Sequence, residues 1–140
     1  MAPLMAWLGL EEIRRWPQLV ALRCRQMRKF LDFASSHSMT SFLPGRYFDT
    51  RVKIVPLRLV WQHHEAEKYR EKLSKLIDVD QTWFLAPVIA TTSPLEDFAY
   101  TRGECPTAEA ICTTMINLPA SISDNTLEMV FGILAEGTGE

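Results

Sequence analysis

The chain has 140 residues, of which 47% are hydrophobic and 23% are charged, and its formal net charge is −2. Such a length and composition are typical of one globular domain with its own core. The nearly balanced charge provides no general attraction for nucleic acid or for an acidic membrane surface. No apolar run reaches the ~20 residues that cross a bilayer.

The amino-terminal stretch is apolar, but its basic residues, Arg14 and Arg15, follow the apolar segment instead of preceding it. This order argues against a secretory signal peptide. The three cysteines, Cys24, Cys105 and Cys112, form an odd and sparse set that predicts no disulfide framework. A reducing compartment, the cytoplasm, is therefore predicted.

Residues 9–36 have the apolar spacing of an amphipathic helix. The residues that define this spacing are Leu10, Ile13, Leu19, Leu22, Met27, Phe30, Leu31 and Phe33. Pro17 interrupts the pattern, and a proline in a helix interior costs about 3 kcal/mol. The helix is therefore expected to kink or to restart with Pro17 in its first turn.

The middle of the chain predicts a loop, a strand and a second helix. A loop is expected at 37–50. Residues 51–60 are rich in β-branched residues and predict a strand, at a sheet edge because Pro56 cannot donate a ladder hydrogen bond. Residues 62–78 predict an amphipathic helix, and residues 79–85 a second short strand.

The last third begins with a long loop at 86–104, of the kind that binds or covers ligands in compact domains. A short helix is expected at 106–114 and a strand at 115–118. Asn125 and Glu128 have the spacing of a capping box, which predicts a last helix over roughly 125–136.

This order of elements predicts an α+β (two-layer α/β) domain with a small, largely antiparallel sheet packed by helices. We expect a single small domain over 1–140. Its parts would be the long amino-terminal helix at 9–36, a core of sheet and helices at 51–134 and a frayed tail at 136–140.

Two stretches could carry chemistry. Cys105 precedes a proline at a predicted helix start, where a thiol pKa is lowered, but no histidine stands near it in a recognisable motif. His63 and His64 are followed by Glu65, yet adjacent histidines on a helix point to different sides and cannot share an ion as an i, i+4 pair could. No catalytic or metal-ligating residue is therefore predicted, and both histidines are expected to be solvated.

Six basic residues occur on the first helix with no acid among them: Arg14, Arg15, Arg23, Arg25, Arg28 and Lys29. They could form a phosphate-binding face, or they could be a solvated face that pairs with nearby acids. Their spacing distributes them around the helix, which favours the solvated face.

Three stretches, read together, resemble a known family. They are AWLGLEEIRRWPQLVALRCRQMRKFLDFA, KIVPLRLVWQHHEAEKYREKLSKL and WFLAPVIATTSPLEDFAYTRGECPTAEAICTTMINLPASIS. The first is similar to the interdomain helix of the DegT/StrS-type sugar aminotransferases, and the second to the strand and helix that follow it. The third resembles the closing region of that family, with Cys-Pro-x-Ala-Glu and then Leu-Pro before a final helix.

The resemblance covers only the carboxyl-terminal small domain of those pyridoxal-phosphate enzymes. It implies a three-stranded sheet with helices on one face, and no cofactor here unless a separate large domain supplies the pyridoxal phosphate. The residues that match the family motif would be architectural: Cys105, Pro106, Ala108, Glu109, Leu118 and Pro119. Pro17 departs from the family pattern, because the helix normally continues at that position.

Two functions follow from the resemblance. The first is a non-catalytic binding or protein-interaction module derived from the small domain. The second is the small subunit of a split nucleotide-sugar aminotransferase, in which Trp83, Pro87, Phe98 and Tyr100 would form a loop that covers the ligand.

In either case the face left by the missing domain predicts a homodimer or a complex with a separately encoded large domain. The candidates for that face are Trp7, Leu8, Leu10, Trp16, Trp83, Phe84 and Phe98.

Overall fold

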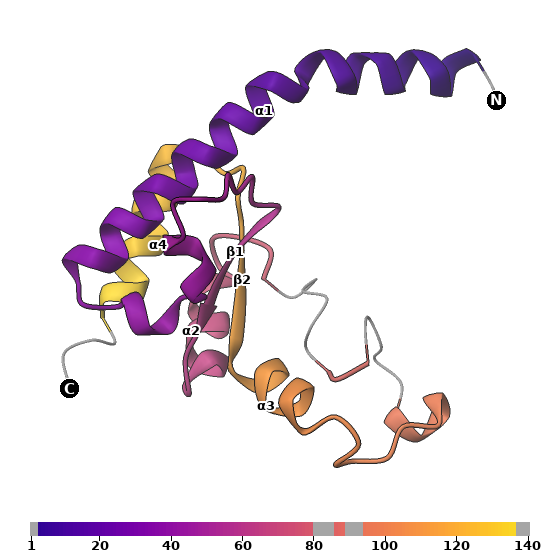
Figure 1. The fold of residues 1–140 in the computed structure, drawn as a ribbon, viewed down its shortest axis with the longest axis vertical. Coiled ribbons are helices and arrows are strands. Elements are labelled where there is room, and N and C mark those ends of the chain that lie inside the picture. Colours follow the sequence, from indigo (N-terminus) through magenta and orange to yellow (C-terminus); the bar gives the residue numbers. More distant parts are fainter. Residues whose placement is uncertain (1–2, 80–85, 89–93, 137–140) are drawn as a thin grey trace.

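The computed structural model describes residues 3–79, 86–88 and 94–136. In these residues it has four helices and an antiparallel sheet of two strands, which confirms the predicted α+β class (Figure 1). The elements are α1 (Pro3–Ser36), β1 (Arg58–Gln62), α2 (Ala66–Leu73), α3 (Pro106–Thr114), β2 (Met115–Pro119) and α4 (Asp124–Ala135). Short 3-10 turns lie at Thr40–Phe42, Gly45–Phe48 and Leu95–Phe98.

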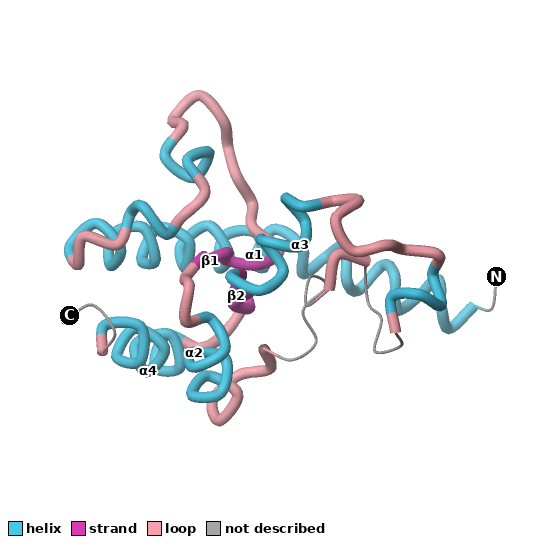
Figure 2. Tube along the Cα trace, turned by 90° about the horizontal axis from the view of Figure 1, so that it is seen from below, coloured by secondary structure: helices cyan, strands magenta, loops and turns pink. Residues whose placement is uncertain are grey.

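The sheet joins segments more than fifty residues apart in the chain. Leu59 lies opposite Leu118, and Trp61 lies opposite Ile116. All four side chains are buried, so these two cross-strand pairs form one apolar face of the sheet. Helices α2 and α4 lie side by side next to the strands (Figure 2).

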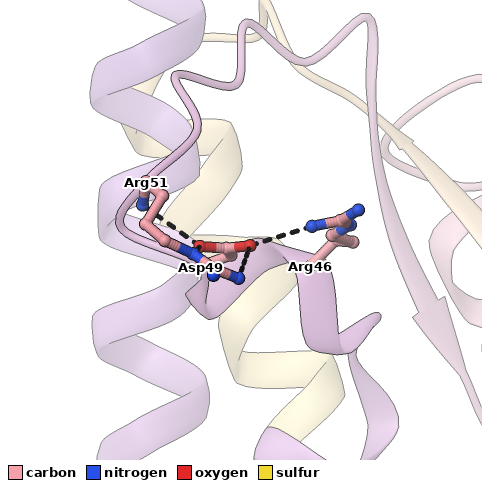
Figure 3. A network of polar contacts seen from close by, with 3 residues as sticks. All are labelled: Arg46, Asp49 and Arg51. Atoms are coloured by element: carbon pink, nitrogen blue, oxygen red, sulfur yellow. Dashed lines mark hydrogen bonds and ion pairs between the residues drawn. The ribbon is translucent and has the colours of Figure 1, made fainter.

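The free edge of β1 is covered by the loop that precedes it. The Val60 N–H donates to the Tyr47 hydroxyl at 3.0 Å, which satisfies a ladder group that β2 does not reach. Asp49 holds this loop in shape, because its carboxylate accepts from Arg46 at 2.9 Å and from the Arg51 side chain at 2.8 and 2.9 Å (Figure 3). The hydrogen bonds from Arg51, followed by that from Arg46, hold the pKa of Asp49 below its ordinary value.

The carboxyl-terminal half of α1 packs on the core. Phe33 stacks on Phe131 of α4 at 4.3 Å between ring centroids, and Phe30 is buried beside them. Gln26 is fully buried, and its amide both donates to the Ile122 carbonyl and accepts from the Ile122 N–H. This pair of bonds attaches α1 to the connection between β2 and α4.

Helix α1 is longer than expected and continues through Pro17 without a restart. Pro17 has no N–H to donate to the carbonyl of Ile13, so one backbone hydrogen bond of the helix is missing. The helical turns before and after Pro17 are nevertheless continuous. The amino-terminal half of α1 projects away from the rest of the molecule (Figure 1). None of the helices in the described residues has the length and apolarity needed to cross a membrane.

The prediction of a strand at 51–60 is wrong for its first seven residues, since β1 begins only at Arg58. Ile54 instead packs against the core beside α1, where its carbonyl lies 3.7 Å from the Cys24 thiol. This irregular stretch includes Pro56, which has no N–H to donate to a ladder. Helix α2 is also shorter than the predicted 62–78 at both ends. Gln62 still belongs to β1, a turn at His64 and Glu65 precedes the helix, and the helix ends at Leu73.

The carboxyl-terminal predictions agree more closely with the structure. Helix α3 has the predicted bounds, and β2 extends the predicted strand by Pro119 alone. The cap of α4 is different: the Ser123 hydroxyl accepts from the Thr126 N–H at 3.0 Å, so Ser123 and not Asn125 caps this helix. Most of the predicted strand at 79–85 lies outside the described residues.

Candidate functional site

The amino-terminal half of α1 exposes an unusual amount of apolar surface. Its large apolar side chains are between 45% and 69% exposed: Leu4, Met5, Trp7, Leu8, Leu10, Ile13 and Trp16. We call residues 4–16 the α1 arm. A helix that is apolar on all sides over its first turns is normally buried, so the α1 arm is a candidate binding surface.

One face of the α1 arm continues the face that packs on the core. This face is marked by residues at spacings of four, three and four positions: Gly9, Ile13, Trp16 and Val20. Met27 lies on the same face, seven residues after Val20. Met27 is buried against the core, whereas Ile13 and Trp16 are exposed. Leu10 and Ile13 belong to the same apolar spacing as the buried residues of this helix, but the core does not extend to them.

The charges of the α1 arm lie mostly away from this face. Arg14 pairs with Glu11 at 2.5 Å and Arg15 with Glu12 at 3.8 Å, each within the same helix. Exposed pairs of this kind add little stability, so they mainly keep one side of the helix polar. The Arg23 guanidinium lies over one face of the Trp16 ring, 5.7 Å from its centroid.

The basic residues of α1 have several different surroundings. Arg14 and Arg15 have the pairs just described, and Lys29 lies 3.3 Å from Asp124 of α4. Arg28 lies at a hollow of about 570 Å³ between α1 and residues 47–54, with Lys53 on its other side. Cys24 also lines this hollow, but none of the residues around it is a histidine that could act as its base.

Of the four residues predicted to cover a ligand, only Pro87 is seen to line a hollow in the described part of the chain. Trp83 and Phe84 lie outside the described residues. Pro87 lines a hollow of about 400 Å³ together with residues of α3, whereas Phe98 is 49% exposed. The Tyr100 hydroxyl donates to the carboxylate of Glu109 at 2.8 Å, so this hydroxyl is already engaged inside the protein.

Glu109 connects α3 to the preceding loop. Besides the hydroxyl of Tyr100, its Oε1 accepts from the Gly103 N–H at 2.6 Å. Gly103 has a φ of 98°, a left-handed conformation that glycine adopts without strain. These bonds, with that from Gly103 the larger cause, lower the pKa of Glu109, while burial and the bond to Glu109 raise the pKa of Tyr100 to about 12. Glu109 is thus an ionised anchor for the loop.

Cys105 is exposed at the start of α3, and its N–H donates to the Tyr100 hydroxyl at 3.2 Å. This contact uses the backbone of Cys105, and the side chain is exposed. The contacts around α3 therefore hold the loop and the helix together through Tyr100 and Glu109.

The two adjacent histidines differ from the prediction. They precede α2 in a turn, so the rotation of a helix does not separate them, and their rings stack at 4.4 Å between centroids. His63 is buried and not solvated, with its ring against Trp61 at 5.3 Å and Tyr69 at 5.0 Å. The predictions that His63 is solvated and that the two rings point apart are therefore wrong, whereas His64 is exposed as expected.

His63, His64 and Glu65 place potential metal-ligand atoms within 4.8 Å of one another. Protein groups already occupy part of this set. Nδ1 of His63 accepts from the Glu65 N–H at 3.1 Å, and the Glu65 carboxylate lies 3.2 Å from Lys68. These contacts also stabilise the start of α2.

Because His63 is buried, we expect the free energy of unfolding to decrease in mild acid. Burial, helped by the charge of His64, lowers the pKa of His63 below its ordinary 6.5. The unfolded chain therefore takes up this proton first as the pH falls through 6.5, and the free energy of unfolding decreases until the pH reaches the folded-state pKa. Above pH 6.5 the residue is neutral in both states and has no such effect.

Urea unfolding at pH 7.5 and at pH 5 will test this expectation. His63→Asn keeps a side-chain acceptor for the Glu65 N–H but does not titrate, so it should show a smaller loss between the two pH values than the unsubstituted chain. The exposed His37 provides the matched control, as His37→Asn should leave the loss unchanged. Equal losses in all three proteins would contradict the role given to His63.

Comparisons with protein-family models, with curated proteins and with solved structures gave no match for this chain.

Proposed function

We propose that this chain is a non-catalytic protein-interaction module whose docking surface is the α1 arm. The observation that carries the proposal is the set of seven large apolar side chains on residues 4–16, all between 45% and 69% exposed. Isolated exposed apolar residues are ordinary, but a continuous cluster on one projecting element is typical of a surface that a partner covers.

The polar groups with the most chemical promise support a structural role instead. Glu109 is held by Tyr100 and Gly103, and Asp49 is held by two arginines. The His63 ring lies in the aromatic cluster of the core. Each of these groups fixes a loop or a helix start, which is consistent with a binding module.

The proposal retains the resemblance to the small domain of DegT/StrS-type sugar aminotransferases. A small α+β domain that opens with a long helix is compatible with such a domain without its cofactor-binding partner. The split-enzyme alternative would use the same α1 arm, with a separately encoded large domain as its occupant and pyridoxal phosphate bound in that domain. The identity of the captured partner distinguishes the two.

Capture from an extract of the native cell tests the docking role of the α1 arm. The double variant Leu10→Glu/Ile13→Glu should retain a specific partner at least tenfold less than the unsubstituted chain, because each carboxylate would have to lose its water in an apolar interface. The control variant Leu57→Glu/Met129→Glu changes two exposed apolar residues outside the α1 arm and should retain the partner normally.

Circular dichroism must show equal helix content in the three proteins, so that a lost partner is not the result of an unfolded helix. The same partners at the same yield on all three proteins would contradict the proposal.

A further inference from the structure

We propose, on the basis of the docking role of the α1 arm, that its partner is the α1 arm of a second copy of this chain. The two helices pair antiparallel, with a two-fold axis near Ile13. In this arrangement Trp16 of each copy packs over Gly9 of the other copy. The chain is then a homodimer joined by its projecting helices, with the two domain bodies at opposite ends.

The position of Gly9 supports this pairing. Glycine in a helix interior costs about 1 kcal/mol relative to alanine, and such a position usually has a reason in packing. A Cβ added at Gly9 would meet nothing within 4 Å, so no contact inside the chain explains the residue. A second backbone or a large side chain from outside could approach closely here.

Trp16 provides the complementary shape. It lies seven residues, or about two helical turns, after Gly9 on the same face, and it is 53% exposed. A two-fold axis between these positions places each large indole opposite the small glycine of the other helix. A symmetric interface needs this kind of self-complementary surface, on which the same patch carries both parts.

The flanking charges favour the antiparallel direction. Glu12 and Arg15 are about 70% exposed and form only a long pair at 3.8 Å. Antiparallel helices place Arg15 of one copy close to Glu12 of the other, so each carboxylate lies between two guanidinium groups. Parallel helices in register would instead leave Gly9 opposite Gly9 and Trp16 opposite Trp16, which loses the fit of large against small.

The apolar residues that share this face are well exposed. Met5, Ile13 and Trp16 lie on the same side of the helix as Gly9 and are 60%, 69% and 53% exposed. A second copy would cover all three, with Trp16 as the largest contribution, because a buried aromatic side chain removes about 150–250 Å² from water. This contact is smaller than the ~800 Å² that each partner buries in a typical stable complex, so the dimer is expected to depend on concentration.

Light scattering of the purified chain over a hundredfold range of concentration tests the association. We expect a mass of twice 16.0 kDa at the upper end. Gly9→Leu should raise the dissociation constant at least tenfold, because the leucine fills the space that Trp16 needs, although leucine is the better helix former. Gly132→Leu is the matched control, since Gly132 is also helical with open space around an added Cβ, and it should leave the mass unchanged.

Disulfide trapping tests the direction. In a background with Cys24→Ser and Cys105→Ser, treatment with copper–phenanthroline should cross-link Ile13→Cys but not Met5→Cys, although both residues lie on the face of Gly9 and Trp16. At the two-fold axis residue 13 of one copy lies beside residue 13 of the other. The two copies of residue 5 would be roughly 24 Å apart along antiparallel helices, beyond the reach of a disulfide, whereas parallel helices would bring them together. Equal cross-linking at both positions would overturn the antiparallel arrangement.

A monomer at every concentration would overturn the homodimer. If arm-dependent capture of another protein persisted in that case, the interaction role would stand with a different partner, so the two failures are distinguishable. Equal association of the unsubstituted chain and Gly9→Leu would overturn the packing of Trp16 on Gly9.

Discussion

Replacing Trp61 with alanine is expected to lower the free energy of unfolding by about 3–5 kcal/mol. Trp61 is the largest of the fully buried side chains, at 1% exposure, and its ring contacts three others. The centroid of Phe42 lies at 5.8 Å, that of His63 at 5.3 Å and that of Tyr69 at 4.7 Å. Removing the indole leaves a cavity that these rings can fill only in part.

Urea denaturation followed by circular dichroism measures this loss. Trp7→Ala is the control, because Trp7 is 56% exposed on the α1 arm and its removal should change the stability of the isolated chain by only about 0.5 kcal/mol. A loss below about 1 kcal/mol for Trp61→Ala would show that the aromatic cluster around β1 is not the core of the domain.

Replacing Gln26 with leucine is expected to cost about 2–4 kcal/mol, although leucine is close in volume and apolar. The side-chain amide of Gln26 is fully buried and satisfies both backbone groups of Ile122. Leucine would leave a buried N–H and a buried carbonyl without these partners, and each such group costs about 1–3 kcal/mol.

The matched control for Gln26→Leu lies in the same helix. Gln18 is exposed, so Gln18→Leu should change the free energy of unfolding by about 0.5 kcal/mol or less. If the two variants unfold at the same urea concentration, the attachment of α1 through Ile122 does not contribute to stability.

Local signals explain why the carboxyl-terminal half was predicted well. Pro106 occupies the first turn of α3, where a missing N–H has no cost, and Pro119 ends β2. The four buried residues of α4, which are Leu127, Val130, Phe131 and Leu134, also follow a helical spacing that can be read along the chain. Each of these signals acts within a few residues, so sequence alone could detect it.

The predictions that failed depend on contacts between distant segments. The β-branched residues at 51–57 are in irregular structure because this stretch lies beside α1, with Ile54 packed on the core. His63 is buried because Trp61 and Tyr69 surround it, and nothing near it in sequence signals an aromatic cluster. Gln26 likewise gives no local sign of its bonds to Ile122, 96 residues away.

The candidate site was predicted in part. Trp7, Leu8, Leu10 and Trp16 were expected on an exposed apolar face, and the structure places all four on the α1 arm. Ile13 was predicted only as part of the helical spacing, and the structure places it on the same exposed arm. The spacing identifies a face of a helix, but only the tertiary structure determines how far along the helix that face is covered.

The continuity of α1 also sets a distance. About 17 residues separate Ile13 from the buried Phe30, which at 1.5 Å per residue is roughly 25 Å of helix. Two copies joined at Ile13 would therefore hold their bodies roughly 50 Å apart, with identical surfaces facing in opposite directions. Such a dimer would be bivalent, with one binding surface on each body. It would bind an isolated target site with the affinity of one body, and it would bind more tightly to sites repeated at that separation, because both bodies could bind at once. Any insertion or deletion within residues 14–29 would change this reach and, through the helical rotation, the direction in which each body faces.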